Sequence, residues 1–404
     1  MEAPLDRGWM ITRVLAIPMI LAAAAAASAQ AEPAREARYR ALLSRGLEAG
    51  LPALVVVIDR PGEPVWSGAA GTVDLRTSEP ATTTSRMHLA SVNKLTTALA
   101  VLRLVDEGRL RLEDRVIDRL AGDEVVATLP HVESVTVGQL LDHSSGLYAT
   151  NNDPEYIEAL IGPRAGESAR WTPHDFVRLS AAGDPVGEPG SGHYYSDTNY
   201  VLLGLVVEAV MGESYRDWIV KTQFEPLGME RSYFLSDFGW DAELPAGTAR
   251  GYLKDSEVIR SITEISDRFP RVGDDFWATT AAGERLDAAA GIVGGAGDLH
   301  RIGRAVFRGD LLSPESRSVL LAAADGLDAA PLGTERQRTL RGHRKAYGVL
   351  LAAEGDGPGG SHSLLAYHPE TGTIVVALTN VFGLWTESDF FFDDVVATAL
   401  GHGG

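Results

Sequence analysis

The sequence of 404 residues predicts an α/β (α+β) fold, in which an antiparallel sheet is flanked by helices and carries an inserted helical subdomain. Three observations support this prediction. Strand-like apolar runs occur near both ends of the chain, helical patterns fill the stretch between them, and Gly/Pro-rich segments separate the elements. The simplest architecture therefore joins the strands of the two ends in one sheet.

The first part of the chain is typical of an export signal. Two arginines precede an apolar run at 14–27, which ends in small-x-small sequences of the kind cut by signal peptidases. An uncleaved membrane span is the alternative, but this run is short, rich in alanine and interrupted by Pro18, which is marginal for a bilayer core of roughly 30 Å. We expect removal of residues 1–29. A domain at 30–404 without a stable membrane span would then be periplasmic or secreted.

The elements follow in order along this domain. A short helix is expected at 34–49, and two strand-like runs, 54–59 and 64–70, flank a Pro-Gly turn. Helical spacing of apolar residues then covers 90–107, 137–141, 176–182, 200–210, 215–224 and 299–307, with strands at 347–352, 363–368 and 373–379. We interpret Gly295-Ala296-Gly297 as a tight bend. The sheet subdomain should thus comprise about 30–90 and 290–404, and the helical subdomain about 91–289.

Composition excludes several classes of protein. Hydrophobic residues make up 45% and charged residues 23%, as in an ordinary globular chain. A net charge of −19 gives no long-range attraction to nucleic acid or to an anionic membrane. The absence of cysteine excludes disulfides, a thiol nucleophile and thiolate metal sites. Because metalloprotease, P-loop and dinucleotide-binding motifs are also absent, we predict no cofactor and no metal.

The strongest chemical signal is the sequence Ser91-Val92-Asn93-Lys94 at the start of a helical run. Residues three apart share one face of a helix, and Lys94 continues into the apolar face of this run. Desolvation lowers the pKa of a lysine, and such an amine beside a hydroxyl can activate a serine. Ser91 would also lie at a helix N-terminus, where backbone N–H groups favour an oxyanion. The alternative is that Ser91 only caps the helix and Lys94 extends into solvent.

Several short motifs follow Ser91-x-x-Lys94 in order along the chain. The main ones are Leu140-Leu141-Asp142-His143-Ser144-Ser145-Gly146-Leu147 and Tyr195-Ser196-Asp197, followed by Tyr200–Gly204, Pro226–Met229, Ala290–Gly294 and Leu364–Gly372. Together they resemble the serine β-lactamase and penicillin-binding protein family, in the branch of class C enzymes, DD-carboxypeptidases and related esterases. The resemblance covers nearly the whole mature chain. It implies a five-stranded antiparallel sheet flanked by helices, with a helical subdomain.

The resemblance also implies roles for individual residues. Ser91 would be the acylated nucleophile, Lys94 its proton-handling partner, and Tyr195 the general base or acid. The third residue of the second motif is usually an asparagine that binds substrate, but here it is Asp197. Its attraction to Lys94 would reach about 4 kcal/mol at 4 Å with an effective dielectric of 20, which keeps the amine protonated. Whether Lys94 or Tyr195 takes the serine proton therefore stays open. A backbone amide at Gly357, or at the residue before it, should complete the oxyanion hole.

The third motif of the family is where this sequence departs most. The family carries Lys or His followed by x-Gly on the strand that lines the cleft, and there the basic residue helps to hold a substrate carboxylate. The corresponding residue here is Ala353 or Glu354, and neither is basic. This departure argues against a substrate that carries a carboxylate. Arg344 or Lys345 are the nearby candidates for a replacement.

We therefore predict an exported serine hydrolase that forms an acyl-enzyme at Ser91 and cleaves a small, neutral or cationic ester or amide. Esterase activity is the first expectation. A D-aminopeptidase or DD-carboxypeptidase acting on D-amino-acid peptides is the second, and β-lactamase activity the third. The alternative outside enzymes is a hydrolytically silent relative that binds or senses a ligand. We expect a structural role for His143, and residues 236–288 resemble the family least.

Overall fold

A computed structural model of the protein describes residues 32–238, 242–279, 286–325, 327, 335–337, 340–383 and 390–402. The expected signal segment, residues 1–29, lies outside these ranges. Within them, no helix combines the length and the apolar character that a membrane crossing requires.

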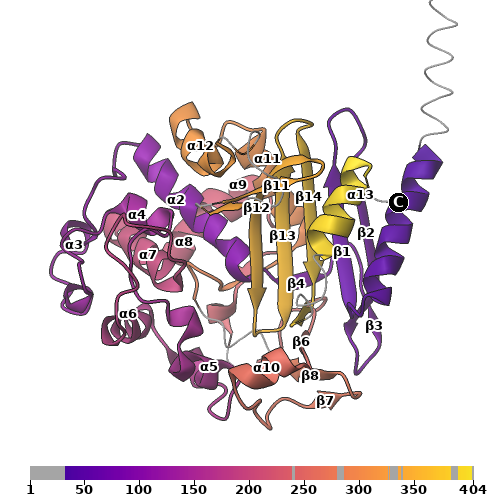
Figure 1. Ribbon diagram of the computed structural model, residues 1–404, viewed down its shortest axis with the longest axis horizontal. Helices are drawn as coiled ribbons and strands as arrows, with labels where there is room; N and C mark the ends of the chain where they lie inside the picture. Colours follow the sequence, from indigo (N-terminus) through magenta and orange to yellow (C-terminus); the bar gives the residue numbers. More distant parts are fainter. Residues whose placement is uncertain are drawn as a thin grey trace, which may run out of the picture.

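The largest sheet joins the two ends of the chain, as the sequence predicts (Figure 1). Its described strands run in the order β10-β11-β12-β13-β14-β1-β2-β3, and each pairs antiparallel with its neighbours. Their bounds are β1 Ala53–Asp59, β2 Trp66–Asp74, β3 Glu79–Pro80, β10 Glu335–Gln337, β11 Arg341–Lys345, β12 Gly348–Gly357, β13 Ser361–His368 and β14 Thr373–Thr379. This sheet therefore exceeds the five strands that the resemblance implies. The division into subdomains near residues 90 and 290 stays a prediction.

Two smaller sheets were not expected from the sequence. One has the order β4-β9-β5 and the other the order β15-β6-β8-β7. Their strands are β4 Arg86–His88, β5 Tyr233–Phe234, β6 Gly251–Lys254, β7 Arg271–Val272, β8 Phe276–Thr279, β9 Ile292–Gly295 and β15 Val381–Phe382. The tight bend expected at 295–297 is wrong, because β9 ends there and a helix begins at Ala296. Neither glycine is required by close packing, since the nearest atom to a Cβ at Gly295 or at Gly297 would lie 3.7 Å away.

Helices occupy the middle of the chain and both of its ends. An N-terminal helix covers 32–48. The others are α2 Lys94–Asp106, α3 Val116–Arg119, α4 Val137–Leu141, α5 Pro154–Leu160, α6 Pro173–Ala182, α7 Asp197–Met211, α8 Tyr215–Ile219, α9 Glu225–Leu227, α10 Glu257–Ile262, α11 Ala296–Phe307, α12 Pro314–Leu321 and α13 Ala397–Leu400. Local signals fix several starts: α4 follows a capping box of Thr136 with Gln139, and α5 follows the Asp153 cap and has proline at its first position.

The sheet is covered on both faces, which explains why β1 is apolar throughout. Alternate side chains of a strand point to opposite faces. Val55 and Val57 belong to the core cluster that includes α2 and α11, whereas Leu54 and Val56 pack with residues of the N-terminal helix and of the C-terminal segment. Every residue of β1 is buried as a result.

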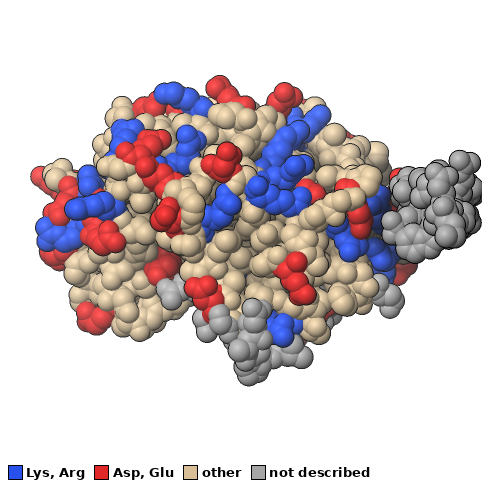
Figure 2. Space-filling view, turned by 90° about the horizontal axis from the view of Figure 1, so that it is seen from above, with Lys and Arg blue, Asp and Glu red and all other residues tan. Residues whose placement is uncertain are grey.

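The surface combines both signs of charge. On the face seen in Figure 2, Lys and Arg side chains lie among Asp and Glu side chains rather than apart from them. The net charge of −19 therefore does not gather into one acidic area on this face.

The end of β12 lies directly against the segment that carries Ser91. A Cβ at Gly355 would lie 2.5 Å from the Leu89 carbonyl oxygen and 2.6 Å from the backbone nitrogens of Ser91 and Val92. These neighbours are backbone atoms, so the clash could not be relieved by the movement of a flexible side chain. Only glycine allows β12 to come this close.

Replacing Gly355 with alanine should therefore separate β12 from the Ser91 segment. We expect Gly355→Ala to lower the free energy of unfolding by about 1–3 kcal/mol, as overpacking does, and to reduce hydrolytic activity. Urea unfolding and ester hydrolysis measure the two effects. The control is Gly297→Ala in α11, where the nearest atom to a new Cβ lies 3.7 Å away. Equal stability of both variants and the wild type would contradict this account of β12.

Candidate active site

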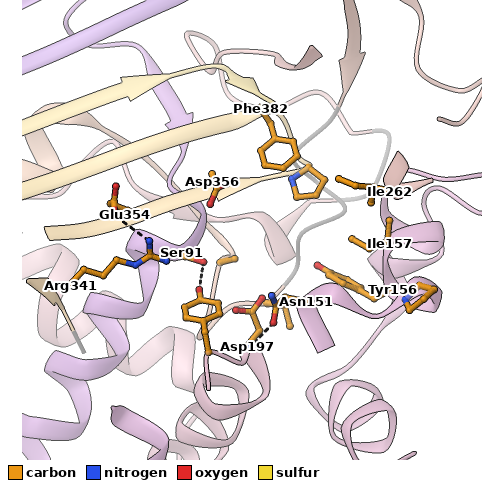
Figure 3. Close-up of a pocket in the computed structure, with 15 residues that line it drawn as sticks. Ser91, Asn151, Tyr156, Ile157, Asp197, Ile262, Arg341, Glu354, Asp356 and Phe382 are labelled. Atoms are coloured by element: carbon orange, nitrogen blue, oxygen red, sulfur yellow. Dashed lines mark hydrogen bonds and ion pairs between the residues drawn. The ribbon is translucent and has the colours of Figure 1, made fainter. Parts of the chain in front are cut away.

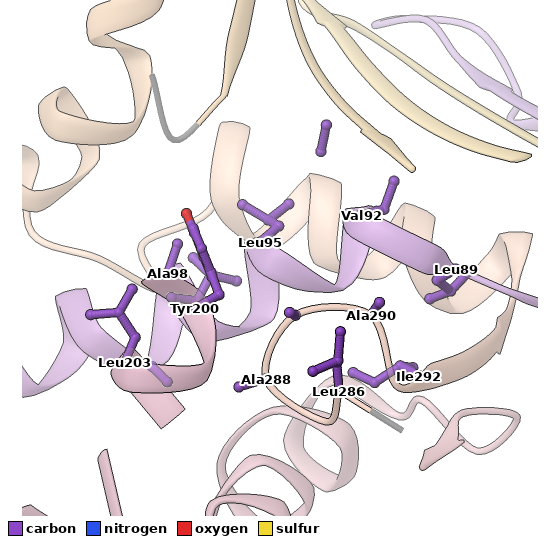
Figure 4. Packing of buried hydrophobic residues seen from close by; sticks show 14 of the residues in the cluster. Leu89, Val92, Leu95, Ala98, Tyr200, Leu203, Leu286, Ala288, Ala290 and Ile292 are labelled. Atoms are coloured by element: carbon purple, nitrogen blue, oxygen red, sulfur yellow. The ribbon is translucent and has the colours of Figure 1, made fainter. Parts of the chain in front are cut away.

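Ser91 lies on a short 3-10 helix, Ala90–Asn93, that connects β4 to α2. Leu89 and Val92 anchor this turn in the hydrophobic core (Figure 4). The preceding residue, Ala90, is buried with a φ of +45°, which is a costly conformation for a residue with a Cβ. Strain of this kind persists only where the surrounding structure enforces it. The packed turn thus holds Ser91 at the edge of a cavity while its neighbours stay buried.

Two functional groups meet at the Ser91 hydroxyl. The Lys94 amine donates a hydrogen bond of 2.8 Å to Ser91 Oγ, and the Tyr195 hydroxyl donates one of 2.7 Å. Lys94 opens α2, one turn after Ser91, and Tyr195 lies in the loop that leads into α7. The structure therefore brings together the hydroxyl, the amine and the phenol that the sequence singled out, although Tyr195 is 104 positions from Ser91.

The environment of Lys94 excludes the alternative that it extends into solvent. Its side chain is buried, and Nζ lies 2.7 Å from Asp197 Oδ1 and donates to the Ala289 carbonyl oxygen at 3.1 Å. Burial lowers the pKa of Lys94, but the charges of Asp197 and Tyr195 outweigh burial and raise it above its ordinary value. Burial also raises the pKa of the Tyr195 phenol, against the opposing effect of the Lys94 charge. Asp197 thus keeps the amine protonated, as the sequence argument expected.

His143 supports the loop that carries Tyr195. Its Nδ1 accepts hydrogen bonds from the Ser196 backbone N–H at 3.3 Å and from Asn199 Nδ2 at 3.0 Å, and its ring lies 4.5 Å from the Tyr195 ring. Burial holds the pKa of His143 well below its usual value, so the ring stays neutral. These contacts fit the structural role expected for this residue.

Four hydrogen bonds hold the segment 287–290 against the region of Ser91. Four successive carbonyl oxygens of the segment 287–290 accept from side chains on or near the Ser91 turn. Asn93 donates to residue 287 at 2.6 Å, Thr97 to residue 288 at 2.6 Å, Lys94 to residue 289, and His88 to residue 290. No sequence motif signals this contact, because the bonded residues lie about 190 positions apart.

A cavity of about 450 Å³ opens beside Ser91. One end is charged, with Asp197, Arg341, Glu354 and Asp356 in its lining, and the other end is apolar (Figure 3). The apolar lining includes Tyr156, Ile157, Ile262 and Phe382. Ile262 comes from α10, within the part of the sequence that resembles the family least, so this part contributes to the cavity wall.

The end of β12 borders the Ser91 turn. Gly355 packs on the Ser91 backbone, and the assignment of Ala353 or Glu354 to the position of the basic residue of the family stays a prediction. Of the two candidates for the second oxyanion donor, Asp356 lines the cavity, whereas Gly357 is buried and is not among its lining residues. The Asp356 side chain adds an acidic group to this end of the cavity.

A cation does line the charged end of the cavity, although Ala353 supplies none. It comes from Arg341, the first residue of β11, and not from Arg344 or Lys345, which do not line the cavity. Lys345 Nζ instead lies 3.7 Å from Asp393. Sequence reasoning missed Arg341 because only the pairing of β11 with β12 brings it near Ser91.

The pKa values of Glu354 and Asp356 shift in opposite directions. Burial raises the pKa of Glu354, but hydrogen bonding to His343 and the charge of Arg341 outweigh burial and leave the pKa below its usual value. Asp356 is exposed to the cavity, yet desolvation by the surrounding protein raises the pKa of its carboxyl group. Glu354 is therefore the firmly ionised partner of Arg341.

Comparison with known proteins agrees with this geometry. A sequence model of the family described as Beta-lactamase matches residues 30–389. "Penicillin-binding protein 4" of Amycolatopsis lactamdurans is 29% identical over 345 residues, covering 82% of this chain and 81% of that protein. Several other curated relatives are matched over less than half of their own length.

Solved structures share the fold. The D-stereospecific amidohydrolase from Streptomyces sp. superposes with a TM-score of 0.68 at 26% identity, over 85% of this chain and 94% of that chain. The D-amino acid amidase from Ochrobactrum anthropi SV3, solved with L-phenylalanine, gives a TM-score of 0.75 over 91% and 98% of the two chains. Its identity is 22%, so this likeness shows the fold alone.

Removing the Asp197 charge should shift the dependence of activity on pH. The carboxylate raises the pKa of both Lys94 and Tyr195, so Asp197→Asn should lower both pKa values. Whichever group accepts the serine proton, activity should then rise at a lower pH than in the wild type. The measurement is kcat/KM for an ester between pH 5 and pH 10. Asp184→Asn, at an exposed loop position, controls for net charge. If the rise of kcat/KM with pH stays where it is in the wild type, or moves to higher pH, Asp197 does not raise the pKa of the group that accepts the proton.

His88 should make stability depend on pH. Burial lowers the pKa of this imidazole to about 4, from an ordinary value near 6.5. The unfolded chain therefore binds a proton more readily, and stabilisation present above pH 6.5 is lost as the pH falls towards 4, by at most about 1.4 kcal/mol per pH unit. Urea unfolding of the wild type and His88→Gln across this window measures the effect. We expect the wild type to lose more stability than the variant, and parallel losses would show that His88 does not titrate this way.

Proposed function

The chain belongs to the beta-lactamase family of serine hydrolases, and from that premise we propose that it hydrolyses a small ester or amide through an acyl-enzyme at Ser91. The observation that supports this proposal is the meeting of the Lys94 amine and the Tyr195 hydroxyl on Ser91 Oγ at 2.8 and 2.7 Å. Nucleophile and proton-handling groups within hydrogen-bonding reach are what acyl transfer to a hydroxyl requires.

In the proposed first step, Tyr195 reacts as the phenolate, which forms when its hydroxyl loses its own proton to solvent and which the adjacent Lys94 charge favours. Ser91 Oγ attacks the substrate carbonyl carbon, and its proton passes to this phenolate. Lys94 already carries its proton, held by Asp197, so it serves as a fixed positive charge beside the reacting oxygen. The carbonyl oxygen becomes an oxyanion, for which backbone N–H groups of Ser91 and of Asp356 are the proposed donors. The close approach of Gly355 to the Ser91 backbone supports this pairing.

In the next steps of the proposed reaction, the carbonyl group re-forms and the leaving group departs. The leaving group receives the proton from Tyr195 as it departs. Water then attacks the ester bond to Ser91, again losing its proton to Tyr195, and the proton returns to Ser91 Oγ when the acid product leaves. Tyr195 thus acts as base in one direction and as acid in the other, as microscopic reversibility requires.

Ester hydrolysis is the activity that we expect to be measured most readily. An activated ester loses a leaving group that needs no protonation, whereas an amide nitrogen must receive a proton before it departs. Amide or peptide hydrolysis is the second candidate, supported by similarity to proteins described as an amidohydrolase and a penicillin-binding protein. The absence of a basic residue from the third motif does not exclude carboxylate-bearing substrates, because Arg341 lines the cavity.

We also propose that the protein is exported after removal of residues 1–29. The arginines, the apolar run and the small-x-small sequences of this segment support the proposal. Zero cysteines leave the fold independent of the redox state of its compartment.

Replacing the nucleophile tests the proposed function. We expect Ser91→Ala to reduce hydrolysis of p-nitrophenyl acetate by at least about a thousandfold, because the acyl group then has no acceptor. Mass spectrometry of the wild type during turnover should show an acetyl adduct on the peptide that contains Ser91. The matched control, Ser134→Ala, changes an exposed serine outside the cavity and should retain full activity.

Each other outcome of this experiment has a clear meaning. Equal hydrolysis by the wild type and Ser91→Ala would end the claim that Ser91 is the nucleophile. A stable adduct without turnover would instead favour a hydrolytically silent protein that binds or senses a ligand. A panel of a short-chain ester, nitrocefin and D-alanyl-p-nitroanilide then ranks the esterase, β-lactamase and D-aminopeptidase activities.

A further inference from the structure

A second cavity, of about 390 Å³, borders the segment 286–288. Leu286 lines both this cavity and the one beside Ser91, and the next two residues, Asp287 and Ala288, line the second cavity. The starts of α6 and α8 and residues of α7 form most of the remaining lining. The volume is typical of a site for a small molecule.

The segment 286–288 joins the second cavity to the region of Ser91 (Figure 4). Its carbonyl groups at 287 and 288 accept hydrogen bonds from Asn93 and Thr97, which follow Ser91 along the chain. Tyr215 lines the second cavity and also contacts Thr97, since the two hydroxyl oxygens lie 2.6 Å apart. A molecule in this cavity would therefore contact groups that are bonded to the start of α2.

Aromatic side chains form part of the lining of the second cavity. Trp171 is half-buried, and its ring lies 5.1 Å from the ring of Phe176. Both residues line the cavity, together with Tyr215 and the aliphatic residues Val201 and Leu205 of α7. Apolar and aromatic walls of this kind favour a ligand with a flat apolar ring.

Glu208 gives the same lining a negative charge. It lies in the last turn of α7, where the helix dipole also favours a cation. Its Oε1 accepts a hydrogen bond of 2.9 Å from the Tyr215 backbone N–H, and among the described residues the carboxylate forms no ion pair. Arg216, in contrast, donates to Asp237 and has its Nε 3.8 Å from Asp287 Oδ2. The lining therefore carries more acidic than basic charge.

Two other polar side chains of the lining have partners of their own. His174 Nε2 lies 2.7 Å from Asp123 Oδ2, and Asp123 is not part of the lining. The Ser236 hydroxyl donates a hydrogen bond of 2.7 Å to Asp287. These contacts leave Glu208 as the group best placed to receive a charged ligand.

We propose that the second cavity binds a small aromatic amine, with its ring against Trp171 and its ammonium group on Glu208. A hydrogen bond between ions is stronger than one between neutral groups, and an aromatic face also attracts a cation. The bound ring would pack against Leu286 and Ala288 and hold their segment in place, which should favour the arrangement around Ser91. This effect on catalysis rests on the proposed hydrolase function, whereas the binding itself does not.

Calorimetry with the wild type and three indole compounds tests the binding. Tryptamine is a cation, tryptophol is its uncharged alcohol and indole-3-acetate is an anion. We expect tryptamine to bind about tenfold more tightly than tryptophol, and indole-3-acetate to bind most weakly. Glu208→Gln keeps an acceptor for the Tyr215 N–H but loses the charge, so it should weaken tryptamine about tenfold and leave tryptophol unchanged. The control Glu213→Gln removes the same charge just after α7, outside the lining, and should alter neither.

Hydrolysis of p-nitrophenyl acetate tests the effect on the cavity beside Ser91. We expect saturating tryptamine to raise kcat/KM by about fivefold, with half of the effect at the Kd measured by calorimetry. The parameter kcat/KM reports the steps up to acylation, so capture of the acyl group by the amine does not change it. In Glu208→Gln, the concentration that gives half of the effect should rise with the Kd.

Several results would overturn the proposal. Equal affinity of the wild type and Glu208→Gln for tryptamine, or tighter binding of indole-3-acetate, would refute the ammonium site. Competition of tryptamine with the ester, together with weaker binding to Asp356→Asn, would place the amine beside Ser91 instead. An unchanged or lower kcat/KM at saturation would refute the effect on catalysis. Normal binding of tryptamine without any hydrolysis dependent on Ser91 would overturn the proposed function and leave the second site standing.

Discussion

The site depends on the buried positive charge of Lys94. An ammonium group out of water costs several kcal/mol unless opposite charge and hydrogen bonds surround it. Here Asp197 lies 2.7 Å from Nζ, the Ala289 carbonyl oxygen accepts a hydrogen bond at 3.1 Å, and the rings of Tyr195 and Tyr200 lie 5.0 and 5.8 Å away. Each of these partners comes from a segment distant in sequence from α2. Satisfying one charge thus fixes the positions of the start of α7, the loop before it and the segment 287–290.

The charge of Lys94 also accounts for the hydrogen-bonded backbone of the segment 287–290. The four carbonyl groups of 287–290 bond to side chains of the Ser91 region, so this wall cannot move without leaving Lys94 and its neighbours unsatisfied. On the opposite side, Gly355 brings the backbone of β12 against that of Ser91. A rigid wall on both sides favours a fixed position for the reacting carbonyl group, which is what catalysis by positioning requires.

The sequence predicted those features of the site that depend on local pattern. Ser91 and Lys94 are one helical turn apart, and Tyr195 lies in a motif, so each was accessible without a structure. The strands β1, β13 and β14 were predicted within about two residues, because long apolar runs between turns identify them. Short strands such as β4 and β5 were missed, since two or three residues are too few to show the alternation of apolar and polar residues that identifies a strand. Arg341 was missed because its place at the cavity depends on strand register, which no local pattern encodes.

We propose that aspartate at position 197, where the family usually has asparagine, divides the proton chemistry between the two partners of Ser91. A neutral amide at this place would leave Lys94 free to lose its proton in response to burial. The carboxylate instead holds the amine as an ammonium group, which can stabilise negative charge but cannot accept a proton. Acceptance of the serine proton then falls to Tyr195, whose hydroxyl is bonded to the same oxygen. In this proposal, a residue of the same shape but different charge assigns the role of base to Tyr195, because the charge lies inside a buried network.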